Sequence, residues 1–231
     1  MRSIFIYALI IFSLTTKAQT AFSNVRECIQ VSSFKTALTQ MDSCIAKNYH
    51  KDSALYYKGL MYIRLNNLKA ATLNADQLIK TYPDFKDAHY LTGLIYSADK
   101  NYDKSIEEFN IVIAKYPKHV DALCSRSSAY GLSGNYTKCI DDLNTCLSFK
   151  PMFWQGYSSR AYWYEFQGNH ARAIKDYETC INLDPKNFDA YFSLAQILHK
   201  QNDKVKSCEV INNAIRSGSQ MAEDLKENFC N

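Results

Sequence analysis

The chain has 231 residues, of which 47% are hydrophobic, and its 27 basic and 23 acidic side chains give a net charge of +4. Without a basic cluster, so even a balance argues against nucleic acid or an acidic membrane surface as the partner. The sequence contains no Cys-x-x-Cys pair, no glycine-rich phosphate loop and no Gly-x-Ser-x-Gly elbow, so we expect no metal site, no cofactor and no enzyme.

Residues 1–18 have the pattern of a secretory signal peptide. Arg2 gives a positive start, residues 4–14 are almost wholly apolar, and Thr16 and Ala18 supply the small residues before cleavage. An uncleaved membrane anchor is the alternative, but the apolar run is shorter than the ~20 residues that a spanning helix needs. We expect an exported chain, periplasmic or secreted, with no membrane span after cleavage. The Ala-Gln junction resembles exported proteins of Bacteroidota-type bacteria.

The four prolines of the chain return at a fixed interval of 34 residues, which predicts a stack of similar units. They are Pro83, Pro117, Pro151 and Pro185. The five frames aligned on them are 52–85, 86–119, 120–153, 154–187 and 188–221. Each frame predicts a helix, a turn and a second helix. Turn residues such as Asn66, Gly134 and Gly168 lie near the middle of a frame, and proline disfavours helix in the residue before it.

The aligned frames also agree in side-chain size. One column holds only small residues, namely Gly59, Gly93, Ser127, Ala161 and Ala195. A second small column holds Ala71, Ser105, Cys139, Ala173 and Ser207. Small residues let two helices approach closely, and the large apolar residues around them would fill the remaining space.

These columns resemble those of the tetratricopeptide repeat family, whose 34-residue helix pair has a Gly/Ala, Tyr, Ala, aromatic, Pro signature. The signature is found in Gly59–Tyr62–Ala71–Pro83 and in Ala161–Tyr164–Ala173–Tyr177–Pro185. The resemblance covers residues 52–221 and, weakly, residues 19–51. It implies an all-α fold, a right-handed α-solenoid of antiparallel helix pairs. Such repeats serve many partners, so the family indicates binding in general and no particular partner.

The two ends of the array are expected to differ from its middle, because each terminal unit presents one face to water. Residues 19–51 predict a degenerate helix pair, since Ala37, Met41 and Cys44 fall in columns of the first clear frame. Residues 222–231 predict a short capping helix whose apolar side chains pack inward.

All eight cysteines follow the expected cleavage site, and outside the cytoplasm disulfides can form. In an antiparallel helix pair, two residues equally far from the turn lie at the same height. The bridges expected on this basis are Cys124–Cys146 and Cys208–Cys230, with Cys28–Cys44 fitting less closely. Cys139 and Cys180 fall in core columns, where a thiol packs as a small apolar residue.

Charged residues form two further columns. Arg126 and Arg160 share one, and Asp142 and Asp176 share another, whereas the frame with Leu194 lacks both charges. This joint occurrence predicts ion pairs Arg126–Asp142 and Arg160–Asp176 between the two helices of a repeat. Anion binding by the arginines is the alternative.

In the family that the chain resembles, the first helix of each pair lines the concave side of a superhelix. The side chains left there after subtracting the core columns are mostly apolar or aromatic, as in a peptide-binding groove. The candidate peptide-binding residues are Tyr56, Leu60, Tyr90, Leu94, Tyr162, Phe166, Phe192 and His199. Packing of these rings between neighbouring repeats is the alternative.

The sequence therefore predicts a non-catalytic scaffold of the cell envelope that binds a protein or peptide on its concave surface. The alternative is an accessory subunit that docks by its convex face on an envelope enzyme or a secretion complex.

Overall fold

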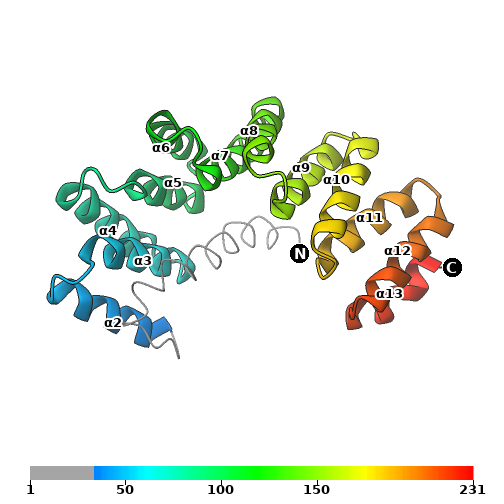
Figure 1. Ribbon diagram of the computed structural model, residues 1–231, viewed down its shortest axis with the longest axis horizontal. Helices are drawn as coiled ribbons and strands as arrows, with labels where there is room; N and C mark the ends of the chain where they lie inside the picture. Colours follow the sequence, from blue (N-terminus) through cyan, green and yellow to red (C-terminus); the bar gives the residue numbers. More distant parts are fainter. Residues whose placement is uncertain (1–33, 231) are drawn as a thin grey trace. The chain divides into compact units, whose positions relative to one another are not determined.

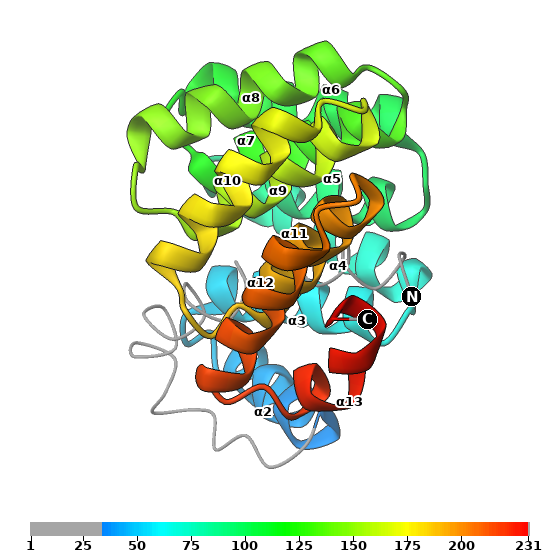
Figure 2. The same cartoon turned by 90° about the vertical axis from the view of Figure 1, so that its right-hand side faces the viewer.

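The computed structural model describes residues 34–230, and Figures 1 and 2 show these residues as helices joined by short turns. The described residues form twelve helices and no strand, which confirms the all-α class. The helices fall into two compact units, divided after Asn135. Each unit is described by itself below.

The helices of unit 1 are α2 (Phe34–Ala46), α3 (Lys51–Arg64), α4 (Leu68–Thr81), α5 (Ala88–Ala98), α6 (Tyr102–Lys115) and α7 (Val120–Leu132). The helices of unit 2 are α8 (Tyr136–Phe149), α9 (Trp154–Phe166), α10 (His170–Leu183), α11 (Phe188–Lys200), α12 (Lys204–Arg216) and α13 (Gln220–Cys230). The frame 120–153 contains α7 and α8, so the division between the units falls inside one predicted frame.

The turns inside the frames owe their shape to one left-handed residue each. Asn66, Gly134, Gly168 and Asn202 have φ of 55°, 88°, 76° and 64°, as their residue types predict. In the second frame the left-handed residue is Lys100, with φ of 62°, and not the asparagine that follows it. Asn101 instead caps α6 by accepting a hydrogen bond from the backbone N–H of Lys104.

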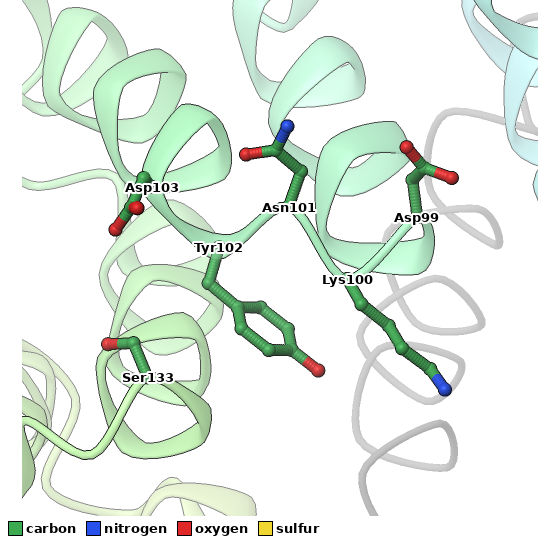
Figure 3. Close-up of a pocket in the computed structure, with 6 residues that line it drawn as sticks. All are labelled: Asp99, Lys100, Asn101, Tyr102, Asp103 and Ser133. Carbon is green, nitrogen blue, oxygen red and sulfur yellow. The ribbon is translucent and has the colours of Figure 1, made fainter.

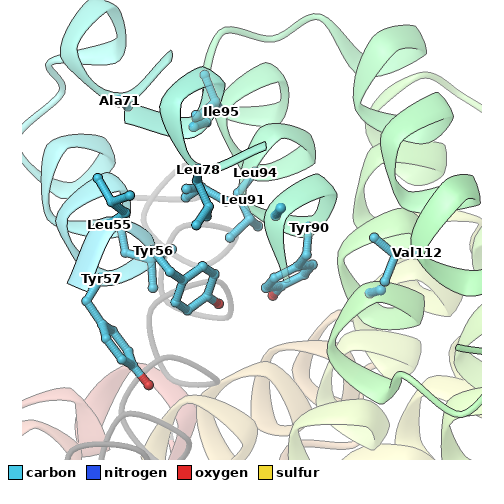
Figure 4. Close-up of a cluster of buried hydrophobic side chains, with 14 of the residues drawn as sticks. Leu55, Tyr56, Tyr57, Ala71, Leu78, Tyr90, Leu91, Leu94, Ile95 and Val112 are labelled. Atoms are coloured by element: carbon cyan, nitrogen blue, oxygen red, sulfur yellow. The ribbon is translucent and has the colours of Figure 1, made fainter. Parts of the chain in front are cut away.

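Unit 1 is held together by an apolar core that runs from α2 to α7. The first helices α3 and α5 contact each other and their own second helices, α4 and α6, and α5 also contacts α7. Figure 4 shows the centre of this core, where Leu55, Leu78 and Leu91 are at most 1% exposed. The first small column allows two helices to approach closely here, as the sequence predicted. A Cβ atom added at Gly93 would lie 2.5 Å from the ring of Phe109, so only glycine fits.

Unit 2 has two apolar clusters. The first lies around α9, α10 and α11 and includes the fully buried Ala161, Ala173 and Cys180. The second extends through α11 and α12 to α13, where Ala222 is fully buried. The predicted capping helix therefore exists as α13, and it begins at Gln220, slightly earlier than expected.

Several predictions fall outside the described residues. The signal peptide at 1–18, the first half of the degenerate pair at 19–51 and Cys28 all lie there. Among the helices that the structure describes, none is both long and apolar enough to cross a membrane.

Candidate binding surface

Arg160 on α9 and Asp176 on α10 form the ion pair that the sequence predicted. Arg160 Nε and Nη2 donate to the two carboxylate oxygens of Asp176 at 2.7 and 2.8 Å. A third donor, Nη1, reaches Asn144 Oδ1 on α8 at 2.7 Å. The hydrogen bonds to Asp176 raise the pKa of Arg160 above its ordinary value. Because the guanidinium is held by two partners of its own unit, the structural role is favoured over anion binding.

The second predicted ion pair, Arg126–Asp142, joins α7 to α8 and therefore crosses the division between the units, so it stays a prediction. Within unit 1, Arg126 Nη1 donates to Asn110 Oδ1 on α6 at 2.6 Å. This is the bond that Arg160 makes to Asn144 in unit 2. In both frames that contain it, the arginine thus ties its first helix to the second helix of the preceding repeat, a role that the sequence did not predict.

The column of Asp176 has different chemistry in each unit. In unit 1 its first member, Asn74, is buried and donates to the backbone carbonyl of Leu55. Its second member, Glu108, lies 2.8 Å from His89 Nδ1. In each case a polar side chain of the second helix is satisfied by the first helix, as buried polar groups require.

Cys208 on α12 and Cys230 on α13 form a disulfide in the structure, and this is one of the predicted pairings. The Cys124–Cys146 pairing crosses the division between the units, and Cys28 lies outside the described residues. Those two bridges stay predictions.

Cys139 and Cys180 pack in the core of unit 2, as their columns predicted, and both are fully buried. Burial, with a smaller contribution from Asp184, raises the pKa of the Cys180 thiol to about 12. This thiol stays protonated at neutral pH and is a poor nucleophile.

The candidate groove residues of unit 1 are not exposed. Tyr56, Leu60, Tyr90 and Leu94 are between 1% and 9% exposed and belong to the core cluster, as Figure 4 shows for three of them. The expectation that they project into a groove as apolar anchors is wrong. The reason is that α3 contacts α5 and α5 contacts α7, so these positions lie at the contact between first helices.

The candidate residues of unit 2 are more open. Phe166, at the end of α9, is 58% exposed, and Tyr162 is half-buried. Two residues that the sequence analysis missed complete a group of rings with them, Trp163 and, at the start of α8, Tyr136. The ring of Tyr136 lies 5.3 Å from that of Phe166 and 5.9 Å from that of Trp163. Tyr162 meets Trp163 edge to face at 4.9 Å.

We call these four residues, Tyr136, Tyr162, Trp163 and Phe166, the aromatic cluster. Trp163 is only 4% exposed, and its ring contacts those of the other three residues. It therefore holds these rings in place. The concentration of aromatic residues between positions 162 and 166 is the sequence feature that could have predicted most of the aromatic cluster.

Phe192 and His199, the last two candidates, lie on α11 and are half-buried. Phe192 packs against the cluster that α11, α12 and α13 share. The ring of His199 meets that of Phe229 on α13 edge to face at 5.8 Å. His199 Nδ1 is buried and has no hydrogen-bond partner among the described residues. Part of their surface is therefore used to dock α13.

A second group of side chains in unit 1 combines phenols with carboxylates. We call it the Tyr–Asp cluster, and it consists of Tyr56 and Tyr57 on α3, Asp87 and Tyr90 at the start of α5, and Asp121 at the start of α7. His119 supports it. The backbone N–H of Ala122 donates to His119 Nδ1 at 3.1 Å, so Nε2 carries the proton and donates to Asp87 Oδ1 at 2.7 Å.

The electrostatics of the Tyr–Asp cluster are unfavourable to further negative charge. Burial raises the pKa of Tyr56 well above its ordinary value, and Tyr90, Asp87, Tyr57 and Asp121 raise it further. Burial and Asp87 raise the pKa of Tyr57 to about 12. The phenols therefore stay protonated beside two carboxylates.

A polar surface depression of about 500 Å³ lies at the turn between α5 and α6, beside the end of α7. Figure 3 shows its lining residues, which are Asp99, Lys100, Asn101, Tyr102, Asp103 and Ser133. Its carboxylates and its lysine are exposed. Among the described residues no group of His, Cys, Asp and Glu is arranged to hold a metal ion.

Two family models match within the chain. A tetratricopeptide repeat model matches residues 67–120 in unit 1, and a TPR repeat model matches residues 164–202 in unit 2. The chain therefore contains tetratricopeptide repeats, and its fold is that of an all-α helical repeat protein. No curated protein matches it.

Several solved structures share the fold. A tetratricopeptide repeat protein from Parabacteroides merdae is 22% identical, with a TM-score of 0.64, and the match covers 95% of this chain and 84% of that one. PilF from Pseudomonas aeruginosa is 14% identical, with a TM-score of 0.66 and coverages of 78% and 86%. MamA from Desulfovibrio magneticus is 18% identical, with a TM-score of 0.58 and coverages of 73% and 96%. At these identities the likeness concerns the fold alone.

Proposed function

We propose that this chain is a non-catalytic scaffold that holds a protein or peptide, and that apolar side chains of the partner dock on the aromatic cluster of unit 2. The observation that carries the proposal is Phe166, which is 58% exposed although neighbouring rings hold it in place. Rigid aromatic side chains lose little entropy on binding and are typical anchors of protein interfaces. Tetratricopeptide repeats generally mediate protein interactions, which supports the same function.

We further propose that the scaffold works in the cell envelope, in the periplasm or as a secreted protein. The signal-peptide pattern of residues 1–18 supports export. The disulfide between Cys208 and Cys230 supports it independently, because such bonds persist in oxidising compartments.

The second candidate function is docking through the second helices of the repeats onto an envelope enzyme or a secretion complex. Leu73 on α4 is 74% exposed and Val205 on α12 is 81% exposed. Both are large apolar side chains on second helices, which is the face that this alternative requires.

Site-specific photo-crosslinking distinguishes the two functions. A benzophenone amino acid is placed at Phe166 in one variant and at Val205 or Leu73 in matched control variants, and each is expressed in the native envelope. We expect a discrete crosslinked partner from position 166 and only background from 205 and 73. A partner captured from the second-helix positions alone would establish the alternative and reject the proposal.

A point variant confirms the chemistry. Phe166→Asp puts a charge at an exposed position, so it should leave the thermal unfolding of the chain nearly unchanged while abolishing partner capture. Phe192 is less suited to this test, because it packs against α13 and its replacement would disturb the fold.

A further inference from the structure

Glu165 on α9 borders the aromatic cluster, because it comes directly before Phe166 and three residues after Tyr162. Its side chain is only 19% exposed. Within the described residues its carboxylate accepts one hydrogen bond, a long one of 3.4 Å from the hydroxyl of Tyr177 on α10. Lys200 Nζ on α11 lies 3.9 Å from the other carboxylate oxygen. A mostly buried charge needs close partners to offset its lost hydration, so these two distant contacts leave Glu165 poorly compensated.

The end of α9 adds to the negative charge at this position. The last backbone carbonyls of a helix carry partial negative charge, which a basic residue in the last turn offsets. The last turn of α9 contains Glu165 and no basic residue, whereas the last turn of α11 contains Lys200 and a histidine. Arg172, at the start of α10, places its guanidinium over the ring of Tyr164, at 5.5 Å. A further cation beside Phe166 is therefore favoured.

The ring of Phe166 and the carboxylate of Glu165 lie on different sides of α9. Successive side chains of a helix point about 100° apart. Phe166 contacts the ring of Tyr136 on α8, whereas Glu165 contacts groups on α10 and α11. A segment that crosses the end of α9 therefore meets the ring with one side chain and the carboxylate with a nearby one.

A lysine or arginine of the partner suits the position beside Glu165. Its cation can replace Lys200, whose side chain is 58% exposed and can turn into solvent. An acidic partner would be repelled by Glu165. A purely apolar partner would bury the carboxylate further without giving it a new hydrogen bond, which costs free energy.

We propose that the partner docks on unit 2 through an apolar side chain on the aromatic cluster and a lysine or arginine, within two residues of it, on Glu165. This assignment rests on the proposed function, since it uses the same surface and adds the charge of the partner. It commits the partner to a segment that is both apolar and basic.

Four capped peptides test this assignment on the full chain by backbone-amide shifts in heteronuclear NMR. The first is acetyl-Gly-Lys-Lys-Phe-Lys-Lys-Gly-amide, whose lysines on both sides cover either chain direction. In the second and third, all four lysines are replaced by glutamine or by glutamate, and in the fourth only the phenylalanine is replaced, by alanine. The chain has a net charge of +4, so a general attraction to basic peptides is not expected.

We expect saturable shifts at residues 162–166 with the lysine peptide. It should bind about tenfold more tightly than the glutamine peptide, because it gains a hydrogen bond between charged groups. The glutamate and alanine peptides should bind more weakly than the lysine peptide. Equal affinities for the lysine and glutamine peptides would overturn the assignment, as would the absence of shifts at 162–166 with the lysine peptide.

Variants test the carboxylate itself. Glu165→Gln removes the charge but keeps an acceptor for Tyr177, so it should abolish the preference for lysine and leave the affinity for the glutamine peptide unchanged. Glu178→Gln is the matched control, because it neutralises an exposed carboxylate on α10 and should keep the preference. Lys200→Gln removes the competing cation and should tighten binding of the lysine peptide severalfold. A preference for lysine that survives in Glu165→Gln would reject the assignment.

The peptide test and the photo-crosslinking test can fail independently. If position 166 captures a partner while the lysine and glutamine peptides bind equally, apolar docking on the aromatic cluster stands and only the basic character of the partner is rejected. If position 166 captures no partner in the native envelope, the proposed function is rejected, whatever the peptides show.

Discussion

The two units build the same helix pair with different contacts. In unit 1, glycines at 59 and 93 leave room for the side chains of Leu91 and Phe109, so the helices are joined chiefly by apolar packing. In unit 2 the same column holds Ala161 and Ala195, and a buried ion pair and a disulfide join the helices in addition. A repeat column fixes how closely two helices approach, and the chemistry that secures them can then vary from one frame to the next.

This difference predicts that the stability of unit 2 depends on its buried ion pair and on its disulfide. The stability of unit 1 is predicted to depend on the volume of its buried side chains. Four perturbations test the contrast, and they follow from the largest expected effect to the smallest.

The largest effect is expected from the ion pair of unit 2. Asp176→Ala leaves the mostly buried guanidinium of Arg160 without its carboxylate, and should lower the free energy of unfolding by about 3–5 kcal/mol. Arg160→Ala should also destabilise, and the double variant should lose less than the sum, as measured by urea denaturation. Lys115→Ala is the control, because its pair with Asp84 is exposed and screened by solvent, so its loss should hardly change the stability. Strictly additive losses at Arg160 and Asp176 would contradict the ion-pair account.

Reduction of the disulfide should come next. Replacing Cys208 and Cys230 together by serine removes the covalent link between α12 and α13, at a cost of about 2–4 kcal/mol. Hydrogen exchange should show the loss at residues 220–230 and at the half-buried Phe192 and His199, while α3 to α6 keep their protection. Equal loss of protection in unit 1 would remove the contrast between the units.

A volume change should affect unit 1 instead. Gly93→Ala places a methyl group against the ring of Phe109 and should cost about 1–3 kcal/mol through overpacking. The second substitution Phe109→Leu should recover part of this loss, because it makes room for the methyl group. In unit 2, Ala161→Gly should cost about 1–2 kcal/mol, since it adds backbone freedom and removes one buried methyl group without any overpacking. Thermal unfolding of the three variants gives the comparison, and a Gly93→Ala variant as stable as the native chain would contradict it.

The smallest effect concerns alkaline pH. Tyr57 keeps its proton in the folded chain up to a pKa of about 12, above the ordinary value of 10.0 that applies after unfolding. The folded state then binds more protons than the unfolded state between pH 10 and 12, so this stability is present below pH 10 and declines as the pH rises through that range. Tyr57→Phe should make the decline shallower, and Tyr49→Phe, at a 39% exposed ring, should not. Urea denaturation at pH 9 and pH 11 measures both.

The sequence predicted the helix pairs and several of their fixed contacts well. Prolines, turn residues and small columns act locally or between neighbouring segments, so their effects follow from spacing. Spacing also found the Cys208–Cys230 bridge, which joins consecutive helices at matching heights. The Arg160–Asp176 pair was found from the joint occurrence of the two charges in the same frames. The sequence did not reveal Lys100, which adopts the left-handed conformation without being a residue type that favours it.

Exposure was much harder to predict. Tyr56 and Phe166 were both assigned to one groove, yet Tyr56 lies in the core and Phe166 is largely exposed. Which of two similar rings is covered depends on helices from other repeats. Those contacts leave no regular spacing in the sequence. The Tyr–Asp cluster was missed for the same reason, because its members come from three helices.

By itself, the sequence determined that this protein is a series of antiparallel helix pairs, because a period of 34 residues repeats the same turn and the same close approach. Only the tertiary structure decided where the series divides into two units, which aromatic rings are buried and where phenols meet carboxylates. The physical reason is that local spacing fixes backbone conformation, whereas burial and charge are summed over every neighbour in space.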